Sequence, residues 1–181
     1  ADYYGDVKPK CILVWGHNHE VTSAGSECQF LIHDAIQAGA KLIVVDPRRT
    51  RLAKHAEHWL SLRPGTDDAL ALGMLNVIIN EDLYDHEFVE KWCYGFEALR
   101  ERVQEYPPSR VAEITWLSED EIISAARTFA TTKPATLEWG VGLEHTPNTT
   151  QTVRAISLLM AITGNYDIPG GWLEDLGVLP A

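Results

Sequence analysis

The sequence predicts an α/β fold in which a mostly parallel sheet carries helices on both faces. Short apolar runs alternate with longer helical segments along the chain, which is the order of a sheet built from crossover units. Several runs are apolar without interruption, as expected of strands buried on both faces. Glycine or polar residues follow each run, and loops in that position line the ligand crevice of parallel sheets.

Four segments are expected to form the strands. Residues 11–15 and 42–45 are continuously apolar, residues 58–62 lead into a Pro-Gly turn, and residues 135–141 run into a glycine-rich loop. Helices are expected over residues 23–38, 50–56, 69–79, 85–94, 96–106, 118–131 and 150–162.

Local signals mark the ends of several helices. Gly39 is expected to stop the first helix. Pro107 and Pro108 are expected to end the fifth. Ser118 and Glu121 form a Ser-x-x-Glu capping box that opens the sixth. The apolar face of the first helix is expected to comprise Phe30, Leu31, Ala35 and Ile36.

Length and charge narrow the class of protein. The 181 residues are expected to form a single domain, with an entry segment over residues 1–10, a helical excursion over 85–116 and a loop-rich tail over 163–181. The net charge of −11 argues against general nucleic-acid binding, which needs a basic surface. No apolar run approaches the roughly 20 residues that span a bilayer, and no targeting signal opens the chain, so membrane insertion is not expected. The three cysteines have no metal-site spacing and are expected to be reduced.

The loops after the first two strands carry groups that suit a nucleotide. Gly16 lets the backbone approach a ligand closely, and Asn18 adds an amide. Asp46 is placed to accept hydrogen bonds from ribose hydroxyls, and Arg48 suits a phosphate or a stacked base. The alternative for Asp46 is a strand-ending turn. A full GxGxxG signature is absent, so these loops alone give weak support for a nucleotide.

The turn over residues 63–68 places two carboxylates at the start of the next helix. Thr66 is expected to be the N-cap, and Asp67 and Asp68 fall in the first turn, where carboxylates suit the helix dipole. Such a helix start disfavours phosphate and favours a ligand edge made of donors. Because one carboxylate accepts two parallel hydrogen bonds from the N1–H and the amine of guanine, Asp67 is a candidate guanine reader. A capped helix start without a ligand is the alternative.

The histidines near the strand ends do not predict a metal site. His17 and His19 form His-x-His beside Glu20, but the third and fourth ligands are not evident, so metal binding is the disfavoured interpretation. A lone loop histidine such as His145 is more often a hydrogen-bonding group than a catalyst. No Ser–His–Asp arrangement or P-loop appears, and no catalytic residue is assigned.

Taken in order and spacing, the loop motifs resemble those of the molybdopterin oxidoreductases of the dimethyl-sulfoxide-reductase type. Formate dehydrogenases, nitrate reductases and related molybdenum or tungsten enzymes belong to this family. The likeness covers about residues 10–172. Each motif is short, so the resemblance depends on the whole set of motifs in this order. The motifs are Trp15-Gly16-His17-Asn18, Asp46-Pro47-Arg48-Arg49-Thr50, Arg63-Pro64-Gly65-Thr66-Asp67, Thr163-Gly164-Asn165 and Pro169-Gly170-Gly171.

The resemblance implies a Rossmann-like three-layer domain that binds the guanosine-diphosphate part of a molybdopterin guanine dinucleotide. It implies that Gly16 and Asn18 approach the pyrophosphate region of the cofactor. It also implies that Asp46 and Arg48 hold the ribose and guanosine end. The segment after Asn18 departs from the Asn-Pro and His-Pro that family members often have there.

The same resemblance assigns the two later loops. Asp67, in the turn that contains Gly65, would read the guanine. The loop that contains Gly140, Gly142 and His145 would face the pterin side of the cofactor. These implied roles agree with the positions of the loops after the expected strands.

The resemblance further implies a larger parent enzyme. The family's iron–sulfur motif, its metal-ligating residue and its C-terminal domain are absent from this sequence, so the chain is expected to be a domain excised from a catalytic subunit. A 4Fe-4S cluster and molybdenum or tungsten are expected in the parent, outside this chain. The expected partners are the remaining domains and possible electron-transfer subunits. The parent would be cytoplasmic or exported by the twin-arginine route.

Several functional alternatives stay open. The parent reaction would be two-electron redox or oxygen-atom transfer, although a few family members catalyse non-redox hydration. A free-standing nicotinamide-dependent dehydrogenase would show a GxGxxG and an acid–base pair, and neither is visible. A non-catalytic module of the same fold is the other alternative.

Overall fold

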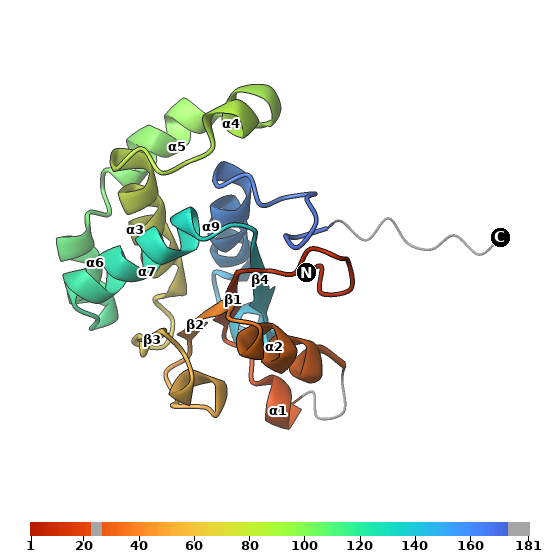
Figure 1. Ribbon diagram of the computed structural model, residues 1–181. Coiled ribbons are helices and arrows are strands. Elements are labelled where there is room, and N and C mark those ends of the chain that lie inside the picture. The colour runs from red at the N-terminus through yellow and green to blue at the C-terminus, as the bar shows by residue number, and fades with distance from the viewer. Residues whose placement is uncertain (23–26, 174–181) are drawn as a thin grey trace.

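The computed structural model describes residues 1–22 and 27–173, in which helices surround a central sheet (Figure 1). The strands are β1 (Cys11–Trp15), β2 (Lys41–Val45), β3 (His58–Leu60) and β4 (Ala135–Trp139). The helical elements are α1 (His19–Thr22), α2 (Glu27–Gln37), the 3-10 helix η1 (Leu52–Lys54), α3 (Asp67–Asn80), α4 (His86–Trp92), α5 (Phe96–Val103), α6 (Pro108–Thr115), α7 (Glu119–Thr131), α8 (Val141–Glu144) and α9 (Thr149–Ile162).

The four strands form one parallel sheet in the order β3-β2-β1-β4. At the end of β1, Trp15 lies opposite Val45 of β2 and opposite Trp139 of β4. Because all the pairs are parallel, the carboxyl ends of the strands share one edge of the sheet. The predicted α/β class with a parallel sheet is therefore confirmed.

Each face of the sheet has its own hydrophobic core. Leu13 and Trp15 point into the larger core, which they share with residues of α3, α7 and α9. Ile12 and Val14 point the other way, against residues of α2 and η1. Figure 1 shows these two sets of helices on opposite sides of the strands. Since all five residues of β1 are buried, a continuous apolar run encodes the central strand.

The helical excursion contains one helix more than expected. Pro107 has φ −63° and ψ 153° and is the N-cap of α6, and Pro108 occupies its first turn. A proline suits that position because its missing N–H has no partner in a helix start. The sequence predicts that the proline pair ends a helix. It does not predict that the same pair starts α6.

Three further expectations need correction. The fourth strand stops at Trp139, and Gly140 is the N-cap of the short helix α8 where a loop was expected. The first long helix is described as α2, and residues 23–26 of the expected helix lie outside the described residues. Phe30, assigned to its apolar face, is 62% exposed, whereas Ile32 is fully buried. The expected helix over 50–56 is the single 3-10 turn η1.

The glycine-rich tail closes the amino-terminal edge of the sheet. Asn165 is fully buried, and its Oδ1 accepts a hydrogen bond from the N–H of Ala135, the first residue of β4, at 2.8 Å. Its Nδ2 donates to Oγ1 of Thr163 at 2.8 Å. The N–H of Asp2 donates to the carbonyl of Gly171 at 2.9 Å, which ties the entry segment to the tail. The tail motifs therefore hold the edge opposite the strand-end loops.

No helix in residues 1–22 and 27–173 has the length and apolar character that crossing a membrane requires.

The buried amide of Asn165 gives a test of this packing. Asn165→Ala leaves the N–H of Ala135 buried without its acceptor, which is expected to lower the free energy of unfolding by about 1–3 kcal/mol. Asn80→Ala is the matched control, because Asn80 is exposed and its side chain, among the described residues, bonds to Gln104 alone. It is expected to change stability by less than about 0.5 kcal/mol. Urea denaturation measures both, and equal effects would refute the anchoring role of Asn165.

Candidate functional site

The strand order places the candidate loops beside one another. β2 and β3 lie on one side of β1, and β4 lies on the other, so the strand order reverses between β1 and β4. Ligands of open parallel sheets bind beyond the carboxyl ends of the strands at this reversal. The loop that begins at Gly16 and the segment that begins at Gly140, the N-cap of α8, leave the sheet at this position.

These two loops pack directly against each other. Gly16 has φ +59°, a conformation that favours glycine. A Cβ at Gly140 would lie 2.8 Å from the carbonyl oxygen of Gly16, and one at Gly142 would lie 3.1 Å from the same oxygen. This close approach accounts for glycine at 140 and 142 without any ligand. Their predicted contact with the pterin side stays a prediction.

A hydrogen bond joins the end of β1 to the start of α3. The indole Nε1 of Trp15 donates to Oδ1 of Asp67 at 2.8 Å. Trp15 is fully buried, so its N–H needs an acceptor inside the protein. The bond holds the Asp67 carboxylate in one orientation at the sheet edge. Sequence reasoning missed this partner, because 52 residues separate the two side chains.

The pKa of the Asp67 carboxyl is shifted from its ordinary value. Burial raises the pKa of Asp67, while the hydrogen bond from Trp15 lowers it, and burial is the larger influence. Withdrawal from water disfavours the charged form, and a partner that donates hydrogen bonds would compensate for the lost solvation. A half-buried carboxylate with a fixed orientation therefore suits a planar donor edge.

The expected cap of α3 has a different geometry. Thr66 occupies the N-cap position, but its hydroxyl donates to the carbonyl of Arg63 at 2.7 Å and makes no capping bond. Asp68 Oδ1 accepts from the N–H of Ala69 at 2.9 Å, and its Oδ2 accepts from Asn148 at 2.9 Å. Asp68 thus bonds to the first turn of α3 and to Asn148 at the start of α9. Asp67 stays the candidate for a ligand.

The loop after β2 is closely held by its own hydrogen bonds. Asp46 Oδ1 accepts from the N–H of Arg48 at 2.8 Å, and the Asp46 side chain is only 4% exposed. The indole of Trp59 donates to the Asp46 carbonyl at 2.9 Å. This arrangement has the hydrogen bonds of a strand-ending turn, the alternative for Asp46, and its predicted ribose contact stays a prediction. The Arg48 side chain is 70% exposed and remains accessible to an anion.

Two arginines stack on tryptophans along the same edge. The guanidinium of Arg49 lies 5.5 Å from the centroid of Trp59, and that of Arg63 lies 5.2 Å from the centroid of Trp116. The N–H of Arg63 also donates to the carbonyl of Thr115 at 2.8 Å. These contacts connect the Asp67 turn to the end of α6 and place a local cationic surface on an acidic chain.

The histidines after β1 are close neighbours, of which His19 is buried and His17 is partly exposed. The rings of His17 and His19 lie 3.5 Å apart between centroids. His19 is 1% exposed, and its two ring nitrogens have no hydrogen-bond partner among the described residues. Burial, together with the charge of nearby His17, lowers the pKa of His19 to about 4, so its ring is neutral near pH 7. Within residues 1–22 and 27–173, no three His, Cys, Asp or Glu side chains are grouped as metal ligands.

The remaining predicted residues lie at the same edge. Asn18 is partly exposed, and its carbonyl accepts from the N–H groups of Val21 and Thr22. Gly65 has φ +83° with open space around its α-carbon, as a tight turn requires. His145 is exposed at the end of α8. The fold therefore brings the predicted loops to one edge, and whether they bind a cofactor stays a prediction.

Comparison with known proteins gives the family. Residues 7–179 match the family model for molybdopterin oxidoreductase. A solved structure of acetylene hydratase from Pelobacter acetylenicus superposes with a TM-score of 0.84 at 48% identity, covering 91% of this chain and 22% of that one. The chain thus spans about a fifth of its relatives' length.

Curated relatives include proteins with different named activities. Acetylene hydratase of Syntrophotalea acetylenica is 56% identical over 86% of this chain and 21% of its own length. Formate dehydrogenase H of Escherichia coli is 40% identical over 75% of this chain and 19% of its own length. The E. coli dimethyl sulfoxide reductase DmsA is 33% identical over 90% and 23%. On its matching residues and its fold, this chain belongs to the molybdopterin oxidoreductase family.

Proposed function

We propose that this chain is the domain that binds the guanosine-diphosphate part of a molybdopterin guanine dinucleotide in a molybdenum or tungsten enzyme. The carrying observation is the half-buried Asp67 carboxylate, oriented by Trp15 at the carboxyl edge of a parallel sheet. Membership of the molybdopterin family supports a pterin cofactor in the parent protein. The guanine form of the cofactor is part of the proposal.

The residues fit this ligand unequally. Asp67 uses Oδ1 for Trp15, and its Oδ2 is proposed to accept from guanine. Arg48 supplies an exposed cation at the proposed ribose and guanosine end, where its Nε lies 3.5 Å from Oδ1 of Asp46. Gly16 and Asn18 are proposed to approach the diphosphate. Asp46 is nearly buried, so a ribose contact would need its side chain to turn outward.

The chain's own residues bind and orient, whereas the bound metal–pterin group supplies the reaction chemistry. Asp67 would fix the base, and the loops containing Gly16 and Gly140 would position the remainder of the dinucleotide. The short helix α8, which contains Gly142 and ends at His145, is proposed to face the pterin. This division requires further domains, and we propose that the chain is one part of a longer catalytic subunit, with a 4Fe-4S cluster and other partners outside it.

The parent reaction has two candidates. Two-electron redox or oxygen-atom transfer is the first, and relatives named as dehydrogenases and reductases support it at 33–40% identity. Non-redox hydration is the second, and the 56% identity to an acetylene hydratase favours it. A nicotinamide-dependent dehydrogenase would instead bind NAD, and saturable NAD binding without GDP binding would count against our proposal.

Exchange of one carboxylate tests the guanine reader. Asp67→Asn is expected to weaken GDP binding about 10- to 100-fold, since hydrogen bonds to charged groups contribute about 1.5–3 kcal/mol. Asp68→Asn removes an equal charge from the adjacent residue and is expected to leave the affinity within about twofold. Isothermal titration with GDP and ADP measures both variants. Equal losses in the two variants would assign the effect to net charge and contradict a role for Asp67 in reading the base.

The pH dependence of stability tests the burial of Asp67. Because its folded pKa is raised, the folded state binds more protons than the unfolded state between about pH 3.9 and that pKa. Stability therefore falls as the pH rises through this window. Asp67→Asn carries no charge and keeps an oxygen for Trp15. It is expected to stabilise the chain more at about pH 7 than at about pH 3.5 in urea denaturation. The same difference at both pH values would contradict the raised pKa.

The two parent reactions differ in their need for an electron acceptor. Hydration adds the elements of water to acetylene and gives acetaldehyde without net electron transfer. The intact parent enzyme is expected to form aldehyde from acetylene when no electron acceptor is supplied, after any reductive activation. Formation of an oxidised or reduced product that depends on an acceptor or donor would favour the redox candidate. Chromatography of the product distinguishes them.

A further inference from the structure

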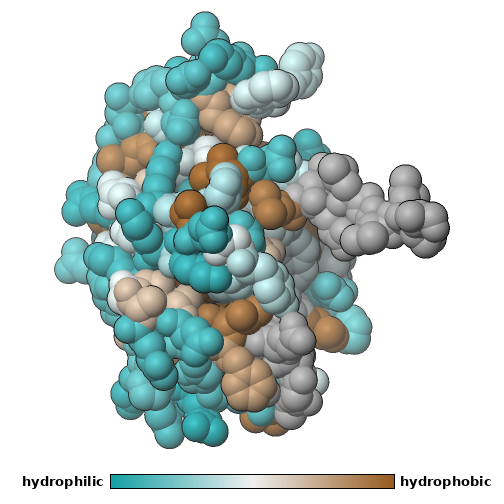
Figure 2. Space-filling model, turned by 45° about the vertical axis from the view of Figure 1, so that its right-hand side comes forward, coloured by the Kyte–Doolittle hydropathy of each residue, from teal (hydrophilic) through white to brown (hydrophobic). Residues whose placement is uncertain are grey.

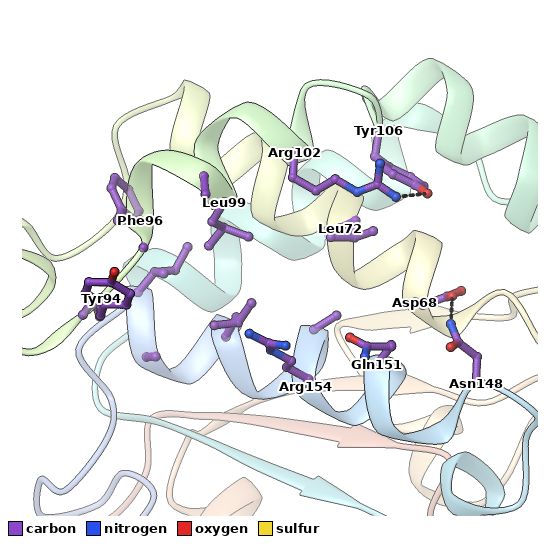
Figure 3. Close-up of a pocket in the computed structure, with 17 residues that line it drawn as sticks. Asp68, Leu72, Tyr94, Phe96, Leu99, Arg102, Tyr106, Asn148, Gln151 and Arg154 are labelled. Atoms are coloured by element: carbon purple, nitrogen blue, oxygen red, sulfur yellow. Dashed lines mark hydrogen bonds between the residues drawn. The ribbon is translucent and has the colours of Figure 1, made fainter.

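An open groove runs along α9, away from most of the candidate loops (Figure 3). It encloses about 530 Å³ between α3, α5 and α9. One end lies at the hydrogen bond between Asp68 and Asn148. Leu72, Leu99 and Leu158 form an apolar part of the lining, and polar side chains such as Gln151 and Arg154 form the rest. Figure 3 shows Arg154 rising from α9 between these helices.

A second cavity continues the groove toward the tail. It encloses about 720 Å³ and is lined by Phe88, Trp92, Ile168 and Trp172. Both cavities share Cys93, Arg154, Leu158 and Ala161, so together they form one continuous surface over α9. We call this surface the α9 groove.

The rim of the α9 groove exposes large aromatic side chains. Trp92 is 76% exposed, and Tyr94 is fully exposed. The face in Figure 2 is mostly hydrophilic, with apolar residues gathered in small areas. Adjacent exposed aromatic residues beside an apolar groove are typical of a surface that another protein segment covers.

The charges in the α9 groove indicate the chemistry of that segment. Arg102 pairs with Glu105 at 2.7 Å and stacks on Tyr106 at 5.3 Å from the ring centroid. Arg154 has no ion pair or hydrogen bond with any side chain in the described part of the chain. An exposed, unpaired guanidinium above an apolar floor suits an apolar segment that carries a carboxylate.

The relatives are much longer than this chain, so further segments of the parent polypeptide are available to cover the groove. This chain corresponds to 22% of the acetylene hydratase chain on which it superposes. Trp172 lines the groove close to Leu173, where the described chain ends. We propose that the α9 groove is an internal docking surface, which a later segment of the same parent polypeptide covers with an apolar side chain and a carboxylate paired to Arg154. The inference rests on the proposal that this chain is a domain of a longer subunit.

The thiol of Cys93 reports directly on this surface, because it lines both cavities and is partly exposed. In the intact parent subunit, Cys93 is expected to react with a maleimide at least about tenfold more slowly than in the separate 181-residue chain. Mass spectrometry reads the labelling at Cys93 itself, so the other cysteines do not interfere. Circular dichroism first checks that the separate chain is folded.

Charge reversal tests the proposed pair within the intact subunit. Arg154→Glu is expected to raise the labelling rate of Cys93 several-fold, because two carboxylates would then face each other. Lys54→Glu, on the opposite side of the sheet, is the matched control and is expected to leave the rate unchanged. GDP affinity is measured in a separate experiment. If GDP does not bind, the proposal on the nucleotide fails, but the labelling rates of Cys93 still test the docking surface.

Three outcomes would overturn the docking surface. Equal reactivity of Cys93 in the intact subunit and in the folded separate chain would show that nothing covers the groove. Protection in the separate chain that grows with its concentration would assign the groove to a second copy. An unchanged rate in Arg154→Glu would exclude the proposed ion pair.

Discussion

The hydrogen bond from Trp15 to Asp67 is the constraint on which the candidate site depends. An indole buried at the end of the central strand needs an acceptor, and Asp67 at the start of α3 provides it. The bond joins two elements that diverge from the sheet edge, and it fixes a carboxylate whose pKa burial raises. Stability and the proposed ligand recognition are thus linked at one side chain. Partial burial of this carboxylate lowers the stability of the free chain. The same carboxylate suits a ligand that donates several hydrogen bonds.

The two edges of the sheet divide structural and proposed functional roles. At the amino edge, Asn165 and the glycines of the tail satisfy buried backbone groups and attach the entry segment. At the carboxyl edge, the loops leave an oriented carboxylate and exposed arginines. The motifs that suggested the family are therefore not all ligand motifs. The tail motif serves the packing of β4. Gly140, which lies outside these motifs, packs against Gly16, and its predicted contact with the cofactor stays a prediction.

Much of this could be predicted from the sequence, because local patterns encode it. The strand at residues 11–15 is buried on both faces, and its uninterrupted apolar run reflects this. The start of α6 was missed because the Pro107–Pro108 pair was interpreted only as a helix stop. The bond between Trp15 and Asp67 has no local signature, since only the tertiary fold brings the two residues together. The same holds for Gly140, whose neighbour is a distant carbonyl.

The central claim is that Asp67 reads a guanine base at the carboxyl edge of the sheet. A crystal structure of the chain, or of its parent subunit, with GDP bound tests it most directly. The account predicts the guanine N1 and exocyclic amine within about 3 Å of the Asp67 carboxylate, with the bond from Trp15 retained. A bound GDP whose base lies elsewhere, with Asp67 still bonded only to Trp15, would contradict it.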